Sequence, residues 1–254
     1  MMGVAGLSVL EMSATLAGAQ TVEVKEKPEL YKYVSYWTFP RAHWADVDQD
    51  NAARYQKILA PALADRTLVS DGDDENQVHS AEGFTHDSRW QADSIADLMK
   101  VLEALRKGSP SSPLFLSSTK PWDQVYVSRF YNWRAGAWKG AYGYKATYKL
   151  KPDAPDPDDA VQTLSSFYVP VFEKMLADGT IVEYEIDREM FHTTDSRAQI
   201  VFSFLMPSAE GLDKFRAALG EALDKNSLLG PAFGSMMANV SPQFDWVRVN
   251  ATYK

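Results

Sequence analysis

Residues suited to chemistry gather in one short segment, Pro40-Arg41-Ala42-His43-Trp44. Histidine titrates near neutral pH, so His43 is a candidate general base. Arg41 is a candidate for holding an anionic group of a substrate, and Trp44 for stacking on that substrate. A structural interpretation fits equally well, because large aromatic side chains mostly serve cores and Arg41 could pair locally. The segment therefore offers an acid–base site and a packing site as alternatives.

A second group of polar residues surrounds a predicted turn. His79 and His86 flank Glu82 and Gly83, and Asp87 follows directly. Imidazole and carboxylate groups are ligands of divalent metals. The spacing matches no zinc signature, and we predict no metal site here.

Two carboxylates lie on a predicted strand over residues 181–187. Glu183 and Glu185 point to the same face of a regular strand. Inside the protein their pKa values would be raised and they could transfer protons. The opposite face carries Val182, Tyr184 and Ile186, which make the better core. We therefore expect both glutamates to face solvent.

Composition limits the function classes. The 254 residues are 45% hydrophobic and 24% charged, which is typical of a globular protein. The absence of cysteine excludes thiolate nucleophiles, cysteine-ligated zinc, iron–sulfur clusters and disulfides. A net charge of −8 without a basic block argues against nucleic-acid or anionic-membrane binding. No segment approaches the roughly 20 apolar residues of a membrane span, and no phosphate loop, dinucleotide fingerprint or nucleophile elbow occurs.

The first nineteen residues differ from the rest. They contain no Lys or Arg, begin with an apolar run and end on Ala17-Gly18-Ala19, a small-x-small cleavage pattern. This resembles the back half of a secretory signal peptide, although the basic first part is missing and Glu11 interrupts the apolar run. We predict a signal-peptide remnant over residues 1–19 and a periplasmic or secreted location. The alternative is a docked or disordered N-terminal segment.

Short blocks recur in the same order in the two halves of the chain, and such repeats indicate the architecture. The matching pairs are Tyr33-Val34-Ser35 with Tyr126-Val127-Ser128, residues 40–44 with 133–138, residues 63–69 with 176–182, residues 86–89 with 194–197, and residues 94–105 with 208–219. The offset grows from 93 to 113, which places about twenty extra residues in the second copy. We expect them to form a long surface loop over 139–159, because its prolines and aspartates cannot continue a helix or central strand. The Ser-, Pro- and Gly-rich residues 107–113 mark the predicted boundary between halves.

Each half reads as strand, helix, strand, strand, helix, strand. The first half has strands over 31–39, near 68, over 84–92 and 114–117, and helices over 51–64 and 95–106. The second has strands over 125–131, 181–187, 199–206 and 245–253, and helices over 160–176 and 208–222. Ser94 and Asp97 are typical of a capping box, and Gly179 ends a helix as a residue with positive φ. The matching residue Arg66 does not adopt that conformation freely, so we expect the first helix to end differently.

Two such βαββαβ units in tandem resemble the dimeric α+β barrel (ferredoxin-like) superfamily in its tandem-repeat form. The residues that carry the resemblance are Tyr33-Val34-Ser35 with Tyr126-Val127-Ser128, and Leu176-Ala177-Asp178-Gly179-Thr180. The resemblance covers residues 31–254 and implies an α+β fold. Repeats over 31–118 and 122–254 would face each other as a pseudo-dimeric barrel.

Members of that superfamily include cofactor-free oxygenases, small-molecule isomerases, haem-dependent enzymes and proteins without known activity, so the fold does not decide the reaction. In haem-binding members a histidine of the second repeat ligates the iron. The resemblance allows that role for His192, which no local motif demands.

The leading hypothesis is a protein that binds an apolar or aromatic small molecule. Its cavity and ligand contacts would come from Trp37, Phe39, Trp44, Trp90, Phe130, Arg134 and Trp138. The second half keeps Arg134 and Trp138 but has Gly136 where the first has His43, which fits one active and one structural half. If the protein is an enzyme, we expect cofactor-independent oxygenation or isomerisation, with His43 as base and Arg41 holding an oxyanion.

Two alternatives stay open: a non-catalytic structural or interaction protein of the cell envelope, and a haem protein using His192. The sequence leaves open whether the protein is catalytic and whether it forms oligomers.

Overall fold

The computed structural model describes residues 25–78, 83–108, 112–191, 199–225, 229–238 and 243–254. The predicted signal remnant, residues 1–19, lies outside this part of the chain, as do His79, Glu82 and His192. No helix among the described residues is long and apolar enough to cross a membrane.

The first repeat runs from β1 to β4. Its elements are β1 (Leu30–Thr38), a 3-10 turn (Arg41–His43), α1 (Trp44–Ala64), β2 (Ser70–Asn76), β3 (His86–Ala92), α2 (Ile95–Gly108), the short α3 (Pro113–Leu116) and β4 (Thr119–Trp133). The second repeat follows after Arg134 and Ala135. Its elements are β5 (Gly136–Lys149), α4 (Pro157–Asp178), β6 (Glu183–Phe191), β7 (Gln199–Met206), α5 (Ala209–Lys225), α6 (Leu229–Met236) and β8 (Gln243–Tyr253).

The eight strands form one closed barrel in the order β1-β3-β2-β8-β5-β7-β6-β4. Each repeat contributes a four-stranded antiparallel sheet, β4-β1-β3-β2 or β8-β5-β7-β6. The two sheets join through the β2–β8 and β4–β6 pairs. The predicted α+β barrel of two tandem βαββαβ units is confirmed.

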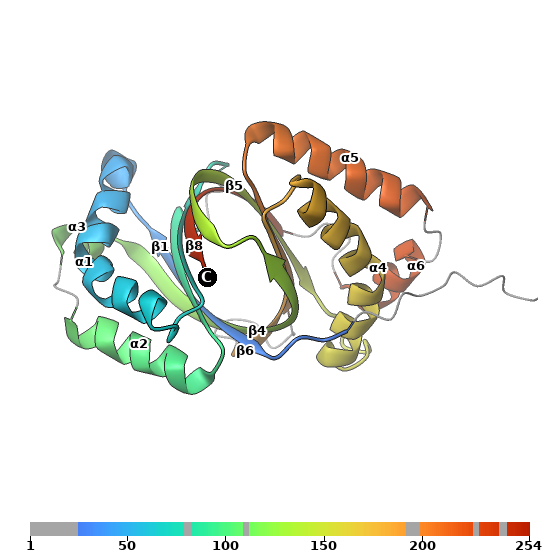
Figure 1. Ribbon diagram of the computed structural model, residues 1–254, viewed down its shortest axis with the longest axis horizontal. Helices are drawn as coiled ribbons and strands as arrows, with labels where there is room; N and C mark the ends of the chain where they lie inside the picture. Colours follow the sequence, from blue (N-terminus) through green and yellow to red (C-terminus); the bar gives the residue numbers. More distant parts are fainter. Residues whose placement is uncertain (1–24, 79–82, 109–111, 192–198, 226–228, 239–242) are drawn as a thin grey trace, which may run out of the picture.

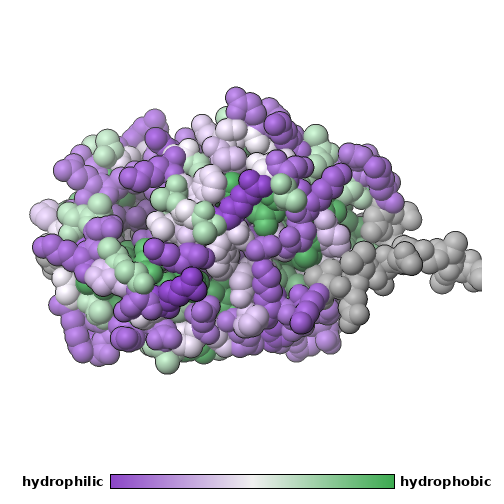
Figure 2. All heavy atoms as spheres, viewed as in Figure 1, coloured by the Kyte–Doolittle hydropathy of each residue, from purple (hydrophilic) through white to green (hydrophobic). Residues whose placement is uncertain are grey.

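Helices cover the outside of the barrel in two groups. Helices α1, α2 and α3 lie on one side of it and α4, α5 and α6 on the other (Figure 1). Each sheet is therefore covered by helices on one face and by the opposite sheet on the other. The molecular face seen in Figure 2 is largely hydrophilic, with hydrophobic residues showing only in small patches.

The predicted boundaries between the repeats were wrong. Residues 139–149, expected to lie in a long loop over 139–159, belong to β5, the first strand of the second repeat. The strand predicted over 125–131 lies in β4, which is the last strand of the first repeat rather than the first strand of the second. The residues predicted as the closing strand, 114–117, instead form α3 and its end, where the Ser112 side chain accepts from the backbone N–H groups of Leu114 and Phe115.

The first long helix of each repeat, α1 or α4, is followed by a residue with positive φ, contrary to expectation. Gly179 after α4 has φ 83°. Arg66 after α1 also has a positive φ, 64°, which is uncommon for a residue with a side chain. The predicted capping box is confirmed, because the backbone N–H of Asp97 donates to Ser94 Oγ at 3.0 Å and Ser94 Oγ donates to Asp97.

Candidate functional site

Charged side chains fill the interior of the barrel. Glu183 and Glu185, expected on a solvent face, point into the barrel and are only 4% and 2% exposed. The expectation failed because β6 is covered on both faces, by α4 on one and by the opposite sheet on the other. The apolar residues Tyr184 and Ile186 pack under the helices, as the strand alternation requires.

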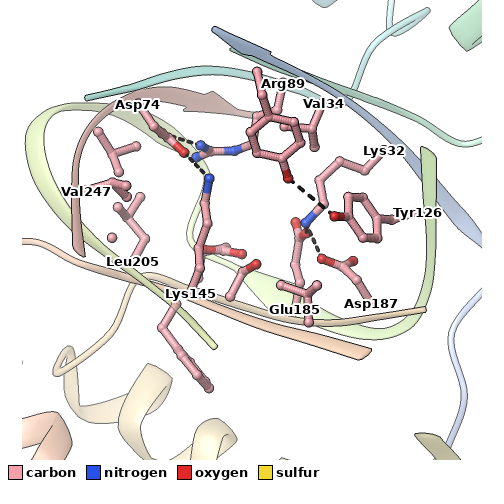
Figure 3. A pocket seen from close by; sticks show the side chains of 17 residues that line it. Lys32, Val34, Asp74, Arg89, Tyr126, Lys145, Glu185, Asp187, Leu205 and Val247 are labelled. Atoms are coloured by element: carbon pink, nitrogen blue, oxygen red, sulfur yellow. Dashed lines mark hydrogen bonds and ion pairs between the residues drawn. The ribbon is translucent and has the colours of Figure 1, made fainter. Parts of the chain in front are cut away.

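Three buried cations pair with carboxylates across this interior (Figure 3). Lys32 Nζ lies 2.6 Å from Glu185 and also pairs with Asp187. Arg89 pairs with Asp74. Lys145 Nζ lies 2.6 Å from Asp74 and 2.9 Å from Asp87.

The network shifts the pKa values of its carboxyls in opposite directions. Burial alone would raise the pKa of Asp74, but Arg89 and Lys145 outweigh it and lower that pKa. Burial raises the pKa of Asp87, and the charge of Asp74 beside it adds to the rise. Asp187 also has a raised pKa, chiefly through burial, which Lys32 only partly offsets.

The space left within this network is small. The interior cavity measures about 30 Å³ and is lined by charged and aliphatic side chains. A cavity of this size holds about one water molecule. Charged, aliphatic and aromatic side chains therefore fill most of the barrel interior.

Most of the predicted aromatic residues of the first repeat do come together, between its sheet and its helices. Trp37, Phe39, Trp44 and Trp90 all pack in this layer. Trp44 donates to the backbone oxygen of Phe39 at 2.9 Å, and the Trp37 and Phe39 ring centroids are 6.3 Å apart.

A histidine that the sequence interpretation placed in a turn lies inside this layer. His86 is 4% exposed. Its ring packs edge to face with the rings of Phe39 and Trp44, at centroid distances of 5.4 and 6.0 Å. Its Nδ1 lies 3.0 Å from Thr85 Oγ1.

A polar cluster of three residues lies on the same face of the sheet. Ser88 Oγ donates to Asp73 Oδ1 at 2.7 Å, and Asn51 Nδ2 of α1 donates to the same oxygen at 2.9 Å. Burial raises the pKa of Asp73 to about 7, and the hydrogen bond from Ser88 limits that rise. A carboxyl with this pKa exchanges its proton near neutral pH, which suits general acid–base work.

The equivalent positions of the second repeat are apolar, and its polar cluster lies elsewhere, where Tyr184 and Asn132 donate to Glu173 of α4. The β6–β7 register sets Ile186 opposite Phe202, just as β2 and β3 set Asp73 opposite Ser88. Chain spacing matches Asn51 in α1 to Leu164 in α4, counted from the paired helix ends Leu63 and Leu176. The two repeats therefore differ in polarity at equivalent positions between sheet and helices.

An open groove runs beside the first turns of α1. It measures about 510 Å³ and is lined by His43, Asp46, Gln49, Asp50, Ala53, Ser112, Pro113 and Leu114. His43 itself is exposed. Arg41 is exposed as well, and its guanidinium stacks on the Trp44 ring at 5.2 Å from the centroid, outside the groove.

The predicted ligand residues of the second half lie elsewhere. Arg134 Nε donates to the backbone oxygen of Leu176 at 3.0 Å, and so caps the end of α4. Trp138 donates to the backbone oxygen of Arg134 at 3.2 Å. Phe130 packs in the core between the second sheet and its helices. The structure therefore does not bring these three to the first-repeat layer.

Sequence reasoning missed Asn51, Asp73, Ser88 and His86 as a group. The signal was present in the block that matches residues 63–69 to 176–182, with its offset of 113. When the same offset is applied to the neighbouring strand, Asp73 of the first half corresponds to Ile186 of the second. A polar residue of the first half thus has an apolar equivalent in the second.

The described residues offer no ready site for haem or a metal ion. Both described histidines, His43 and His86, belong to the first repeat. The corresponding layer of the second repeat is filled by rings, with Phe172 and Phe215 centred 4.7 and 4.5 Å from Phe204. No group of three or more metal-binding side chains occurs in the described part of the chain. His192 as a haem ligand stays a prediction.

Comparison with known proteins supports the fold. No known family profile and no curated protein matches the sequence. Among solved structures, a "putative monooxygenase" from Fusobacterium nucleatum aligns with a TM-score of 0.60 at 4% identity, over 90% of this chain and 95% of the other. An "anthrone oxidase-like protein" aligns with a TM-score of 0.57 at 12% identity, over 90% and 94%. A "putative monooxygenase" from Lactobacillus acidophilus aligns with a TM-score of 0.56 at 9% identity, over 89% and 97%. Together with the strand order, these similarities show that the chain has the tandem-repeat form of the dimeric α+β barrel fold.

Proposed function

We propose that this protein binds a small aromatic or apolar molecule in the groove between α1 and α3 of its first repeat. The observation that carries the proposal is the groove itself, about 510 Å³ in volume and open to solvent. Ligand sites of small molecules fall within this range of volumes. The hydrogen-bonded cluster of Asn51, Asp73 and Ser88 belongs to the same repeat, and its carboxyl with a raised pKa supports this half as the functional one.

The groove combines apolar contacts with a carboxylate that can accept a hydrogen bond. Ala53, Pro113 and Leu114 supply apolar surface. Asp50 Oδ1 accepts from Ser112 Oγ at 2.8 Å, whereas Asp50 Oδ2 is buried and has no hydrogen-bond partner among the described residues. A hydroxyl or amine of the ligand would satisfy that oxygen.

Acid–base chemistry at the groove would come from His43. Its exposed imidazole can take a proton from a bound ligand and pass it to solvent. Proton abstraction is the step that a cofactor-independent oxygenase or an isomerase requires of its protein. The solved structures of this fold described as monooxygenases and as anthrone oxidase-like support the oxygenase interpretation.

The experiment is a binding and turnover screen with hydroxylated aromatic molecules. Binding is followed by tryptophan fluorescence and by NMR shifts of the His43 ring, and turnover by oxygen uptake and product analysis. We expect Asp50→Asn to weaken binding about tenfold or more, because it replaces one of the two acceptor oxygens by an NH2 donor and removes the charge. His43→Gln should keep binding and lose turnover.

Asp224→Asn is the matched control, since Asp224 is an exposed carboxylate on α5 of the second repeat. Binding without oxygen uptake or product would identify a binding protein without oxygenase or isomerase activity. Ligands whose binding is unaffected by both groove variants would show that the groove is not the site.

A further inference from the structure

The ion pairs inside the barrel join one repeat to the other. Lys32 of β1 reaches Glu185 and Asp187 of β6 in the second repeat. Lys145 of β5 reaches Asp74 and Asp87 of β2 and β3 in the first. Ion pairs therefore join the two opposed sheets in addition to apolar side chains such as Val34 and Tyr126, which cluster with Val201 of the second repeat.

Acidic groups outnumber basic ones in this enclosed space. The charged and titratable side chains that face it are Lys32 and Tyr36 from β1, Asp74 from β2, Asp87 and Arg89 from β3, Tyr126 from β4, Lys145 from β5, Glu183, Glu185, Asp187 and Glu189 from β6, and Tyr253 from β8. Glu189 accepts a hydrogen bond from Gln124. Even without Glu189, five carboxyls share three cations.

Glu183 is the carboxyl that none of these three cations pairs with. It is 4% exposed, and it makes no ion pair and no side-chain hydrogen bond with any residue in the described part of the chain. Its neighbour Glu185, in contrast, is bound by Lys32 and by Gln91. An isolated buried carboxylate is so costly that the group takes up a proton instead.

We propose that the barrel interior is a proton-binding centre in which Glu183 is held as a neutral carboxylic acid at neutral pH, and that loss of this proton weakens the contact between the two repeats. Glu183 lines the cavity of about 30 Å³. A water molecule in that cavity would accept a hydrogen bond from the acid and carry the proton when it leaves.

The electrostatics agree with this geometry. Burial raises the pKa of Glu183 to about 8, and the charge of Glu185 adds to the rise. The folded protein therefore keeps a proton that the unfolded chain loses near the usual glutamate value of 4.5. Stability from this group is complete below that value, falls as pH rises, and is lost once pH passes the folded value.

The test compares Glu183→Gln with Glu185→Gln by urea unfolding between pH 5 and pH 9. The proton kept by Glu183 makes the folding equilibrium constant fall about tenfold for each pH unit up to about pH 8, in addition to the fall that Asp73, Asp87 and Asp187 cause below about pH 7, because their pKa values are raised too. Glu183→Gln should remove that tenfold dependence and leave the protein at least as stable as wild type at pH 9. Glu185→Gln removes a partner of Lys32 and should destabilise the protein throughout.

Infrared difference spectra and carboxyl-carbon NMR of the wild-type protein supply a readout that needs no variant. At pH 7 we expect the signal of a protonated glutamic acid, absent from Glu183→Gln and present in Glu103→Gln, whose side chain is exposed. A wild-type protein without that signal would overturn the proposal. So would a Glu183→Gln protein that is as unstable as Glu185→Gln.

Discussion

Ser88 on β3 donates a hydrogen bond to Asp73 on β2, at 2.7 Å, in a layer that is otherwise rich in aliphatic and aromatic side chains. The same register in the second repeat pairs Phe202 with Ile186. The two repeats therefore share a fold but differ in the side chains that lie between sheet and helices at these positions. At these positions the first repeat holds a polar pair and the second an apolar pair, while the polar group of the second layer is Glu173, which accepts from Tyr184.

The first prediction concerns the titration of Asp73. We expect its carboxyl carbon to titrate near pH 7 in NMR, because burial raises its pKa to that value. Ser88→Ala should raise the pKa further, since the hydrogen bond from Ser88 favours the charged form. Ser94→Ala, which removes a helix cap elsewhere, should leave the titration unchanged. A midpoint near 4 in the wild-type protein would contradict the assignment.

The second prediction separates the two arginines that the sequence paired. Arg134→Ala should lower the free energy of unfolding by about 1 kcal/mol, because Arg134 donates to the last carbonyls of α4. Arg41→Ala should cost less, since the exposed Arg41 only stacks on Trp44. Urea denaturation of both variants measures the difference. Equal losses would argue that Arg41 has an unrecognised structural role.

The third prediction concerns the lysine that bridges the repeats. Lys145→Met should destabilise the protein by about 3–5 kcal/mol, because breaking a buried pair leaves carboxylates without compensation. Lys107→Met is the control, and it should cost no more than about 0.5 kcal/mol because the Lys107–Glu103 pair is exposed. Both values come from thermal or urea unfolding at neutral pH. Comparable small losses would mean that the barrel tolerates an uncompensated Asp87.

The fourth prediction uses two glycines. A Cβ at Gly143 would lie 2.8 Å from Val249 Cγ2 and nearer still to Val247, so Gly143→Ala should destabilise the barrel by about 1–3 kcal/mol. A Cβ at Gly220 in α5 meets nothing within 4 Å, so Gly220→Ala should stabilise the protein by about 0.5–1 kcal/mol. Differential scanning calorimetry of the two variants checks the opposite signs.

Local patterns in the sequence predicted most individual elements. The strand over 199–206 agrees with β7 at both ends, and the helix over 160–176 lies within α4. The fold class followed because the repeated order of strands and helices permits few arrangements. Trp37, Phe39, Trp44 and Trp90 pack together, since alternating residues of neighbouring strands share a face, while their role in ligand binding stays a prediction.

Two errors came from strand arrangements that only the three-dimensional structure shows. The early match of Tyr33 to Tyr126 paired β1 with β4, two strands that are neighbours in the barrel rather than equivalents in the two repeats. Glu183 and Glu185 were expected in solvent because alternation marks one apolar and one polar face, and only the closed barrel shows that the polar face is enclosed. Long-range pairing of this kind leaves no local trace in a single sequence.

The two-residue link at Arg134 and Ala135 connects β4 and β5, two strands that are not paired with each other. A chain severed at that link would become two polypeptides of similar length, each with one four-stranded sheet and its helices. Either fragment alone would present bare strand edges, which favour aggregation. Mixed together, they would regain β2–β8 and β4–β6 pairing and the ion pairs between Lys32, Lys145 and their carboxylates. Each repeat therefore depends on the other to complete its sheet edges.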